Sequence, residues 1–524
     1  MRNFATADSE TDPFLFGRVP APFIWGFYDE KLDEPFKYFF NTNDFIDFIK
    51  DYKGIIYMHN GGKFDFYFLF NALAPQSKVI VINGRIAKLK IGDCEIRDSY
   101  LLLPVPLSAY QKDEIDYDIM EKDKRFKNNN MREIVAYLKG DCKYLYDILK
   151  ANFDDYGQKL TLASSAFDYW NKGYNPEKKK PNSGKAFYEH FNKFYYGGRV
   201  ECFTKGIINQ EFQVYDINSA YPYAMQFNHP SGNNYNVLSE LPENYNECFI
   251  QFKGVSRGVL PFRERGKLLF PNDNETREYF ATGWEYALGI EKGLIDTHEI
   301  IRVYQFEKSI SFKNYVDHFF KMKASYKDND PARYLLTKLY LNSLYGKFGQ
   351  SSLKYRDYEL IEKPDIEDYI DNNYDFEGEI GNCALMSSPI SENHMKFYNV
   401  LTAASITGFV RAYLYRHILE CENPLYCDTD SIAFTGKGNF IEGKALGEWE
   451  KEGDFEKGAI GGKKLYAFKY KDKNKYKISS KGARLNEKDI FSIAMGEEIL
   501  YKNNAPTFSI GKEPIFIQRK IKMT

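Results

Sequence analysis

Pairs of acidic residues at strand positions constrain this chain more than any other feature of its sequence. Asp8 and Glu10 stand two positions apart in the run FATADSE, and Asp428 and Asp430 stand two apart in LYCDTDSIAF. Side chains two positions apart on a strand point to the same face of a sheet. Two carboxylates on one face repel each other unless cations or basic groups lie between them. The fold must therefore supply a cation or a basic partner at two separate places.

The first 160 or so residues alternate short strand-like runs with helical ones. Strands are expected at 4–10, 21–30, 54–60, 78–84, 86–92 and 94–100, and helices at 43–52, 64–73 and 131–153. This alternation predicts an α/β domain. The segment Asn171–Lys185 is rich in Lys, Pro, Gly and Asn, which is typical of a connector. Strand–turn–helix segments follow it.

Composition allows several folded domains, since 43% of the 524 residues are hydrophobic. No apolar run approaches the roughly eighteen residues of a membrane span, and the N-terminus lacks a signal-peptide block, so we expect a soluble protein. Seven scattered cysteines without a C-x-x-C pair argue against a zinc site or a disulfide framework and favour a reducing cytoplasm. A net charge of −2 does not decide on a nucleic-acid partner, because carboxylate clusters can offset a basic surface elsewhere.

Two further acids join the first pair in the N-terminal third. Asp65 lies in HNGGKFD, and Asp141 lies four positions after Tyr137, so that these two share a helix face. Converging carboxylates without a basic partner suit two-metal phosphodiester hydrolysis, which needs two hard cations about 4 Å apart. Each acid alone is equally well explained as a solvated surface residue. The ordered set D-x-E, N-x-x-x-F-D and Y-x-x-x-D is far more specific.

In this order the three motifs resemble the exonuclease motifs of proofreading DNA polymerases. The resemblance implies that four residues bind metal: Asp8, Glu10, Asp65 and Asp141. It implies that Tyr137 orients the attacking water and that Lys112, in KDEIDY, contacts the scissile phosphate, as in the protein-primed subgroup. The single-stranded 3′ end would be held by His59, Asn60 and Phe64. Ser9 replaces an apolar residue of the family, and we expect this difference to affect packing rather than chemistry.

A second set of motifs surrounds Asp216, which ends an apolar run in VYDINSAYP. In KLYLNSLYGKFG, Lys338, Asn342 and Tyr345 line one stripe of a helix. A lysine there can bind a triphosphate, Asn and Tyr can contact the forming base pair, and Gly346 permits close approach. Each piece alone is common, because D-x-D hairpins and polar helix faces are frequent.

Together and in order, D-x-x-S-x-Y-P, K-x-x-x-N-S-x-Y-G and Y-x-D-T-D-S resemble the signature of family B DNA polymerases, over nearly the whole chain. The resemblance implies an α/β plus α+β multidomain fold: an RNase H-like 3′–5′ exonuclease domain followed by a right-hand polymerase domain with palm, fingers and thumb. It also implies two-metal nucleotidyl transfer with two Mg²⁺ per active site, replaceable by Mn²⁺. Asp216 and Asp430 would bind the metals, and Asp428 would assist.

The same resemblance assigns nucleotide and DNA contacts. Tyr221 would stack under the incoming sugar and exclude a 2′-hydroxyl, and Lys338 would contact the triphosphate with help from Lys327 or Arg333. The Y-x-G-G element implies template contacts by Tyr195, Gly197 and Gly198. The K-x-Y element implies primer-terminus contacts by Lys464 and Tyr466. Lys481 belongs to a basic run suited to duplex phosphates, although such a run is as often an ordinary solvated face.

The compact plan, with the first exonuclease motif at Asp8, looks like the protein-primed branch of phages with linear genomes. The segments INGRI, RDSYLLLPVPL, IGGKKLYA and SSKGARL are similar to tectivirus polymerases. The implied partners are template and primer DNA, dNTPs and a terminal (priming) protein, with a monomer acting in the host cytoplasm by strand displacement. The expected domains are the exonuclease (1–165), a connector (166–194), the palm (195–240 and 397–482), a priming-protein insertion (241–306), the fingers (307–350), a strand-displacement insertion (351–396) and the thumb (483–524).

Two alternatives stay open. A DNA-primed repair polymerase of the same family has the same site chemistry. A catalytically inactive DNA-binding relative is disfavoured, because it would have no reason to keep seven clustered, mutually repelling acids. The acidic stretch from Asp365 to Glu379 repels phosphates and suits a basic priming protein better than DNA.

Overall fold

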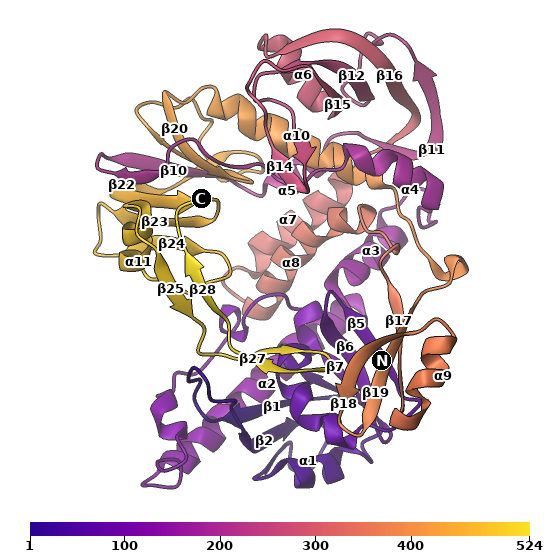
Figure 1. The fold of residues 1–524 in the computed structure, drawn as a ribbon, viewed down its shortest axis with the longest axis vertical. Coiled ribbons are helices and arrows are strands. Elements are labelled where there is room, and N and C mark those ends of the chain that lie inside the picture. Colours follow the sequence, from indigo (N-terminus) through magenta and orange to yellow (C-terminus); the bar gives the residue numbers. More distant parts are fainter.

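Ten strands form one sheet across the lower half of the molecule in Figure 1, in the order β18-β19-β17-β5-β6-β7-β4-β1-β2-β3. The computed structural model describes residues 1–524. We call this layer the N-terminal sheet. Its first seven strands are β1 (Phe4–Thr11), β2 (Pro22–Tyr28), β3 (Phe36–Phe39), β4 (Ile55–Met58), β5 (Lys78–Ile82), β6 (Arg85–Ile91) and β7 (Cys94–Asp98). The pairs β1–β4 and β4–β7 are parallel and the other pairs are antiparallel, which confirms the predicted α/β domain.

Helices cover both faces of β1 and its neighbours. On one face, α1 (Thr42–Ile49) stacks Phe45 on Trp25, with ring centroids 4.6 Å apart. On the other face lies α2 (Asn130–Tyr156), where the Thr6 hydroxyl donates to the Cys142 carbonyl at 2.7 Å. The helix predicted at 64–73 is present as the 3₁₀ helix η2 (Asp65–Ala72). A 3₁₀ run of this length is uncommon, and it begins at Asp65, one of the predicted site residues.

Residues 351–396, called here the hairpin extension, add three strands to the N-terminal sheet. They contain β17 (Arg356–Glu362), α9 (Ile366–Asp371), β18 (Asp375–Ile380) and β19 (Cys383–Pro389). In the register of β17 and β5, Tyr358 pairs with Val79. Leu360 and Leu385 are fully buried in the same core cluster as Val79. The segment that we expect between two polymerase helices therefore docks on the N-terminal domain.

A second sheet of eight strands, called here the central sheet, lies in the upper left of Figure 1. Its strands are β8 (Val200–Cys202), β9 (Gly206–Ile208), β10 (Phe212–Ile217), β20 (Asn423–Asp428), β21 (Ser431–Thr435), β22 (Trp449–Gly462), β23 (Leu465–Tyr470) and β24 (Tyr476–Ser480). The helices α5 (Ala220–Met225) and α10 (Val400–Ile418) belong to the same core. α10 is buried along most of its length, as a helix between two sheets must be.

The four-stranded upper sheet has the order β11-β16-β12-β15. Its elements are β11 (His229–Leu238), β12 (Phe249–Ser256), β15 (Arg277–Thr282), α6 (Gly283–Glu291) and β16 (Ile295–Ile310), with the small hairpin of β13 (Phe262–Glu264) and β14 (Lys267–Leu269) beside them. The sequence-based boundary at residue 240 differs from the structure, because β11 already pairs with β16.

Two helices, α7 (Lys313–Tyr326) and α8 (Pro331–Phe348), stand between the upper and lower halves (Figure 1). We call them the helical pair. α8 packs against α3 (Leu162–Gly173), whose Phe167 and Trp170 are buried in the largest core cluster. The expected connector 166–194 is therefore irregular only between Tyr174 and Gly184, since α4 (Lys185–Phe191) and η6 (Asn192–Phe194) follow.

The C-terminal residues run from the central sheet down to the N-terminal sheet. After α11 (Glu487–Ala494) come β25 (Ile499–Lys502), β26 (Thr507–Ser509), β27 (Lys512–Ile515) and β28 (Gln518–Ile521). These four strands, residues 499–521, are the C-terminal arm and are yellow in Figure 1. At its tip, the Phe508 ring lies 4.9 Å from Tyr67 and 5.6 Å from Phe64. None of the helices has the length and apolarity that a membrane crossing requires.

Candidate active sites

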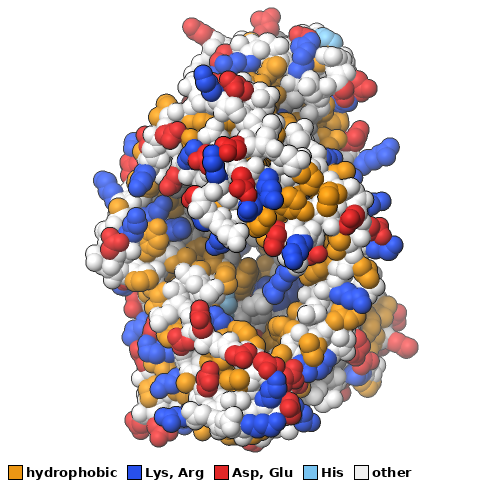
Figure 2. Space-filling view, turned by 90° about the vertical axis from the view of Figure 1, so that its left-hand side faces the viewer, with side chains coloured by type: hydrophobic (Ala, Val, Ile, Leu, Met, Phe, Trp, Pro, Cys, Tyr) orange, Lys and Arg blue, Asp and Glu red, His pale blue; other side chains and the backbone are white.

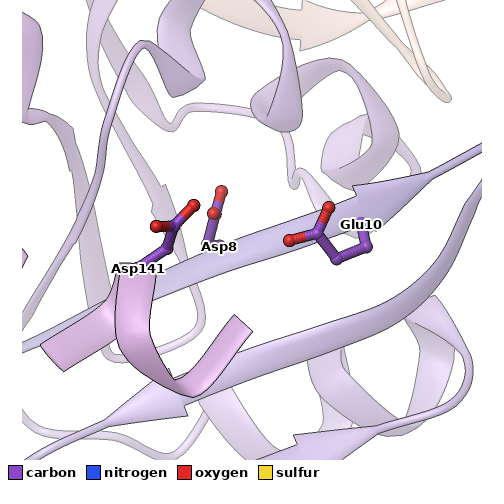
Figure 3. A group of neighbouring side chains, drawn as sticks. All are labelled: Asp8, Glu10 and Asp141. Atoms are coloured by element: carbon purple, nitrogen blue, oxygen red, sulfur yellow. The ribbon is translucent and has the colours of Figure 1, made fainter. Parts of the chain in front are cut away.

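Three carboxylates converge at the junction of β1 and α2. Asp8 and Glu10 project from the same side of β1, and Asp141 projects toward them from α2 (Figure 3). One oxygen from each lies within 4.8 Å of the others. The Asp141 Oδ1 atom is buried and has no hydrogen-bond partner. A buried, unpaired carboxylate oxygen is costly, so this group fits a cation with oxygen ligands.

Burial and mutual repulsion weaken the acidity of the triad. Burial raises the pKa of Asp8 well above its usual value, and the neighbouring Asp65 and Glu10 raise it further. Burial, followed by the charge of Asp141, raises the pKa of Glu10 in the same direction. The pKa of Asp141 is also raised by burial, although Lys112 opposes the shift. Metal binding at this group would therefore displace protons.

Lys112 and Tyr137 lie beside Asp141. Lys112 Nζ is 3.2 Å from Asp141 Oδ2 and 5.2 Å from the centre of the Tyr137 ring. The Tyr137 hydroxyl contacts the hydroxyl of Tyr117 at 2.9 Å. The structure thus brings together residues from β1, α2 and the segment before α2. Tyr117, the last residue of KDEIDY, is an additional member to which the sequence assigned no role.

Asp65 approaches β1 from η2 and is only 3% exposed. The Ser9 hydroxyl donates a hydrogen bond of 2.5 Å to Asp65 Oδ1. Burial raises the pKa of Asp65, and this hydrogen bond opposes the shift. The expectation that Ser9 affects only packing is wrong, because its hydroxyl contacts a predicted metal ligand.

A cavity of about 400 Å³ adjoins Asp8 and Asp65. Its wall contains predicted residues of the N-terminal motifs, namely His59, Asn60 and Phe64. Both His59 nitrogens are engaged inside the protein, by Ser99 Oγ at 3.1 Å and the Val105 carbonyl at 2.9 Å. Asn60 is exposed, and its Oδ1 accepts from Arg85 at 2.8 Å.

The far wall of this cavity comes from the C-terminal part of the chain. It is formed by Arg484, Ala505, Pro506, Thr507 and Phe508. Arg484 lies in the segment SSKGARL, but no motif marks the other four residues or places any of the five beside Asp8. The Phe508 ring meets Phe64 edge to face, so a C-terminal residue contacts one predicted to bind the 3′ end.

The second carboxylate group lies where three strands of the central sheet meet. Asp216 ends the ladder of β10 with β21, where it pairs with Ser431. Thr429 and Asp430 form the turn between β20 and β21, and Thr429 has the left-handed φ of 63°. The turn is fixed by hydrogen bonds from Thr429 N to the Arg199 carbonyl at 2.7 Å and from Ile217 N to the Asp430 carbonyl at 2.8 Å.

Burial and the charge of Asp430 raise the pKa of Asp216 to about 8. Burial and the charge of Asp428 raise the pKa of Asp430 to about 6. Asp428 itself accepts two hydrogen bonds from Lys464 Nζ, at 2.6 and 2.7 Å. The predicted primer-terminus lysine therefore neutralises one of the three aspartates.

Glu452 is a fourth carboxylate at this group that the sequence motifs did not indicate. The register of β10 and β22 shifts between Val214 and Tyr215, which leaves Glu452 as the extra residue of a β-bulge. Its charge raises the pKa of both Asp216 and Asp430, and Lys477 pairs with it. Bulges beside active sites often redirect a side chain in this way.

Tyr221 and Tyr345 lie beside this group and stack in parallel. Their ring centroids are 4.3 Å apart, with an angle of 6° between the planes. Lys338 and Asn342 are exposed on the same helix, α8, and Gly346 is exposed with open space around it. The predicted stripe of α8 thus faces solvent next to the carboxylates of the central sheet.

Basic residues of the helical pair divide into two groups. Arg333 forms ion pairs with Asp155 at 2.8 Å and Asp330 at 2.9 Å. The exposed Lys327 and Lys338 instead both lie near Lys323, because burial and then the charges of these two lysines lower the pKa of Lys323. Lys323 is a further candidate for anion binding, and the sequence motifs did not identify it.

The Y-x-G-G and K-x-Y elements flank the same turn. A Cβ on Gly198 would lie 2.9 Å from the Thr429 side chain, so only glycine permits this approach. The carbonyl groups of Tyr196 and Gly197 accept hydrogen bonds from the buried Arg411 at 2.7 and 2.9 Å. The Tyr195 ring packs on Gly349, the residue after α8.

On the other side, Tyr466 is 9% exposed and stacks on Phe468 at 4.4 Å. Lys481 is exposed, and its backbone N–H donates to the Lys464 carbonyl. Lys464 and Lys481 thus lie side by side, while most of the Tyr466 ring is inside the protein.

A larger opening, of about 1300 Å³, separates β5 and β17 from the helices α3, α4 and α8. Its basic wall residues are Lys78, Lys88, Lys347, Lys354 and Arg356. Figure 2 shows a hollow at mid-height between the two halves of the molecule, with Lys and Arg side chains around it.

Comparisons with known proteins show the family to which the chain belongs. Residues 106–439 match the family of DNA polymerase type B, organellar and viral. The DNA-directed DNA polymerase of Enterobacteria phage PRD1 is 36% identical over 99% of this chain and 98% of its own length. A probable DNA polymerase of Ascobolus immersus is 24% identical over 80% of this chain and 41% of its own length.

The fold comparison is also full-length. Phi29 DNA polymerase, solved with primer-template DNA, superimposes with a TM-score of 0.77 at 19% identity and covers 100% of both chains. This likeness confirms the predicted order of an exonuclease domain and a right-hand polymerase domain, and the PRD1 relative confirms the resemblance to tectivirus polymerases. The chain belongs to the type B DNA polymerases of organelles and viruses, and it is a DNA-directed DNA polymerase.

Proposed function

We propose that this polymerase replicates a linear viral genome from a priming protein, with strand displacement and 3′–5′ proofreading. The observation that carries the proposal is the presence of two separate carboxylate groups, one on the N-terminal sheet and one on the central sheet. Each group contains half-buried or buried acids with raised pKa values. One chain with two such groups suits two phosphoryl-transfer reactions at different places.

In the polymerase reaction, Asp216 and Asp430 would hold two Mg²⁺ ions, or Mn²⁺ in their place. The oxygen donors and the raised pKa values, which signal unneutralised charge, fit such cations. When bound, the ions would activate the 3′-hydroxyl and stabilise the charge of the transferred phosphoryl group. Lys338, with Lys327 and Lys323, would bind the triphosphate, and Tyr221 on Tyr345 would form the floor under the sugar.

Lys464 would bind the primer terminus with Lys481 nearby. Its ammonium group pairs with Asp428 in the protein alone, so primer binding would exchange one anionic partner for another. The hollow between the two halves (Figure 2) would hold the primer-template duplex, since basic side chains border it and phi29 polymerase was solved with such DNA.

In the exonuclease reaction, Asp8, Glu10, Asp65 and Asp141 would hold the cations. Lys112 would contact the scissile phosphate, and the Tyr137 hydroxyl would orient the attacking water. The cavity of about 400 Å³ has room for a terminal nucleotide, with Asn60, Phe64 and Phe508 around it.

Strand displacement would depend on the hairpin extension. This segment and β5 border the larger opening, whose wall carries five basic side chains. A template strand that passed alone along this basic wall would have to separate from its complement. The upper sheet and the acidic face around α9 are the proposed contacts of the priming protein. A DNA-primed repair polymerase remains the competing function.

The replacement Asp430→Asn tests the polymerase assignment. It is nearly isosteric, and we expect primer extension with Mg²⁺ to be lost while degradation of single strands continues. The matched control is Asp472→Asn, in the exposed loop between β23 and β24. Extension by the Asp430 variant at a tenth of the normal rate would refute the assignment. Covalent transfer of a nucleotide to a co-purified priming protein would distinguish protein priming from repair synthesis.

A further inference from the structure

Ser9 lies between two proposed metal ligands in the sequence, yet its hydroxyl contacts a third. Strand alternation turns Ser9 away from the face of β1 that Asp8 and Glu10 share with Asp141. Ser9 is 8% exposed and faces η2, where Asp65 begins the 3₁₀ helix. The side chain is therefore placed to act on Asp65 across the strand.

The contact is a short hydrogen bond from Ser9 Oγ to Asp65 Oδ1, at 2.5 Å. No other side chain donates a hydrogen bond to Asp65, and no basic residue forms an ion pair with it. A hydroxyl-to-carboxylate bond of this length is among the stronger hydrogen bonds in proteins. The orientation of this buried carboxylate thus depends on a single side-chain hydroxyl.

Asp65 stands apart from the other three ligands. The close group contains Asp8, Glu10 and Asp141 but not Asp65, although Asp8, Ser9 and Asp65 border the same cavity. The charge of Asp65 also acts on Asp8. A cation shared with Asp65 therefore requires this carboxylate to stay turned toward Asp8.

We propose that Ser9 is a positioning residue of the exonuclease site, whose hydroxyl holds the Asp65 carboxylate beside Asp8 before any cation binds. The proposal rests on the proposed exonuclease function. An apolar residue at this position, as elsewhere in the family, has no hydrogen to donate. In this chain the Ser9 hydroxyl therefore supplies a contact to Asp65 that an apolar residue at position 9 could not.

The matched pair Ser9→Thr and Ser9→Val tests the proposal. Threonine and valine have nearly the same shape and suit a strand equally, so the pair differs mainly in the hydroxyl. Both are placed in a chain that also carries Asp216→Asn and Asp430→Asn, which leaves the N-terminal site as the metal site under study. Mn²⁺ binding is then followed by electron paramagnetic resonance, without DNA. In chains with a normal polymerase site, the Mg²⁺ concentration that gives half-maximal degradation of single strands is measured.

We expect the threonine variant to bind Mn²⁺ within about twofold of the parent and the valine variant about tenfold more weakly, the effect of one hydrogen bond to a charged group. The half-saturating Mg²⁺ concentration should change by the same factor, with a smaller change in KM for DNA. In an Asp65→Ala background the two variants should become equal. Equal Mn²⁺ binding with Asp65 present, or a difference that persists without Asp65, would overturn the proposal.

Primer extension reports folding in the chains with a normal polymerase site, and the circular dichroism melting curve reports it in all of them. Ser9→Ala replaces Ser9→Val if the valine variant is unstable. Failure of the parent chain to degrade 3′ ends at all would refute the exonuclease function. The Mn²⁺ comparison would still decide the role of Ser9, so the two failures are distinguishable.

Discussion

Lys464 Nζ lies 2.6 and 2.7 Å from the two carboxylate oxygens of Asp428. A lysine expected at the primer terminus thus fixes the aspartate that precedes the turn between β20 and β21. We expect Lys464→Met to lower kcat/KM for primer extension by about tenfold to a hundredfold, because a charged hydrogen-bonded group is worth about 1.5–3 kcal/mol. Lys464→Arg should retain part of the activity. Degradation of single strands should be unchanged, and a methionine variant that extends primers normally would contradict the assignment.

Asp216 should make the metal-free protein sensitive to alkaline pH. Its pKa rises from 3.8 to about 8 on folding. Between these two pH values the folded chain therefore binds more protons than the unfolded chain. This stabilising contribution is complete below about pH 4 and is lost as pH rises through about 8. With EDTA present, we expect melting temperature to fall between pH 6 and 9, and to fall less in Asp216→Asn. Each kcal/mol lost from the free energy of unfolding lowers the melting temperature by about 2–4 °C in a domain of moderate size. An identical pH dependence of the two proteins, measured by scanning fluorimetry, would rule this out.

The double replacement Asp8→Ala and Asp65→Ala should stop degradation from the 3′ end and leave nucleotide incorporation close to normal. The loss should exceed about a hundredfold, since each cation stabilises transition-state charge by several kcal/mol. Single-strand degradation and primer extension are measured on the same preparation. Asp93→Ala, at an exposed turn of the same sheet, is the control. If the double variant still shortened single-stranded DNA from its 3′ end, the N-terminal motifs would have another function.

Sugar selection should depend on Tyr221, whose ring is held parallel to Tyr345 at 4.3 Å. Tyr221→Val removes the ring, so ribonucleotide insertion relative to deoxynucleotide insertion should rise by at least about tenfold. Tenfold is about the lower end of the discrimination that a pocket achieves between substrates differing by one small group. Tyr221→Phe keeps the ring and should keep the selection. The ratio of kcat/KM for the two sugars is the measurement. If valine and phenylalanine variants select alike, another residue excludes the 2′-hydroxyl.

Contact between the hairpin extension and the C-terminal arm should be needed for strand displacement. A Cβ on Gly378 would lie 2.2 Å from the Gly511 carbonyl oxygen, so Gly378→Val must push the two segments apart. We expect gap filling to continue while synthesis through a duplex stops after a few nucleotides. Gly266→Ala, at a left-handed glycine with open space, controls for backbone strain. Full displacement by the Gly378 variant would favour the repair polymerase.

Local spacing was enough to predict which residues of the N-terminal carboxylate group share a face. Asp8 with Glu10 and Tyr137 with Asp141 share faces because the strand and helix periods dictate it, and the structure brings Asp141 to the first pair. The strands of residues 4–100 other than β3 (Phe36–Phe39), which was missed, were predictable for the same reason, since alternation of apolar residues reflects one buried face.

Contacts between distant segments were not predictable. Phe508 lies at the cavity beside Asp8 because it belongs to the C-terminal arm. The periodicity of apolar residues does not predict which distant segment such an arm will contact. Glu452 enters the second site through a bulge, which depends on the pairing of two strands rather than on either sequence. Ser9 looked like a packing change because its hydrogen-bond acceptor lies on another element.

The pairing of β5 with β17 has a consequence for the order in which the chain folds during synthesis. Residues 1–165 leave the ribosome long before β17 has been synthesised. Until then one edge of strand β5, with the sequence KVIVI, has no strand to pair with. A β-rich, apolar edge of this kind recruits other chains. An N-terminal fragment expressed alone should therefore aggregate, whereas the same fragment supplied with residues 351–396 should remain monomeric. Nascent chains would then need either rapid synthesis or a chaperone until the hairpin extension closes that edge.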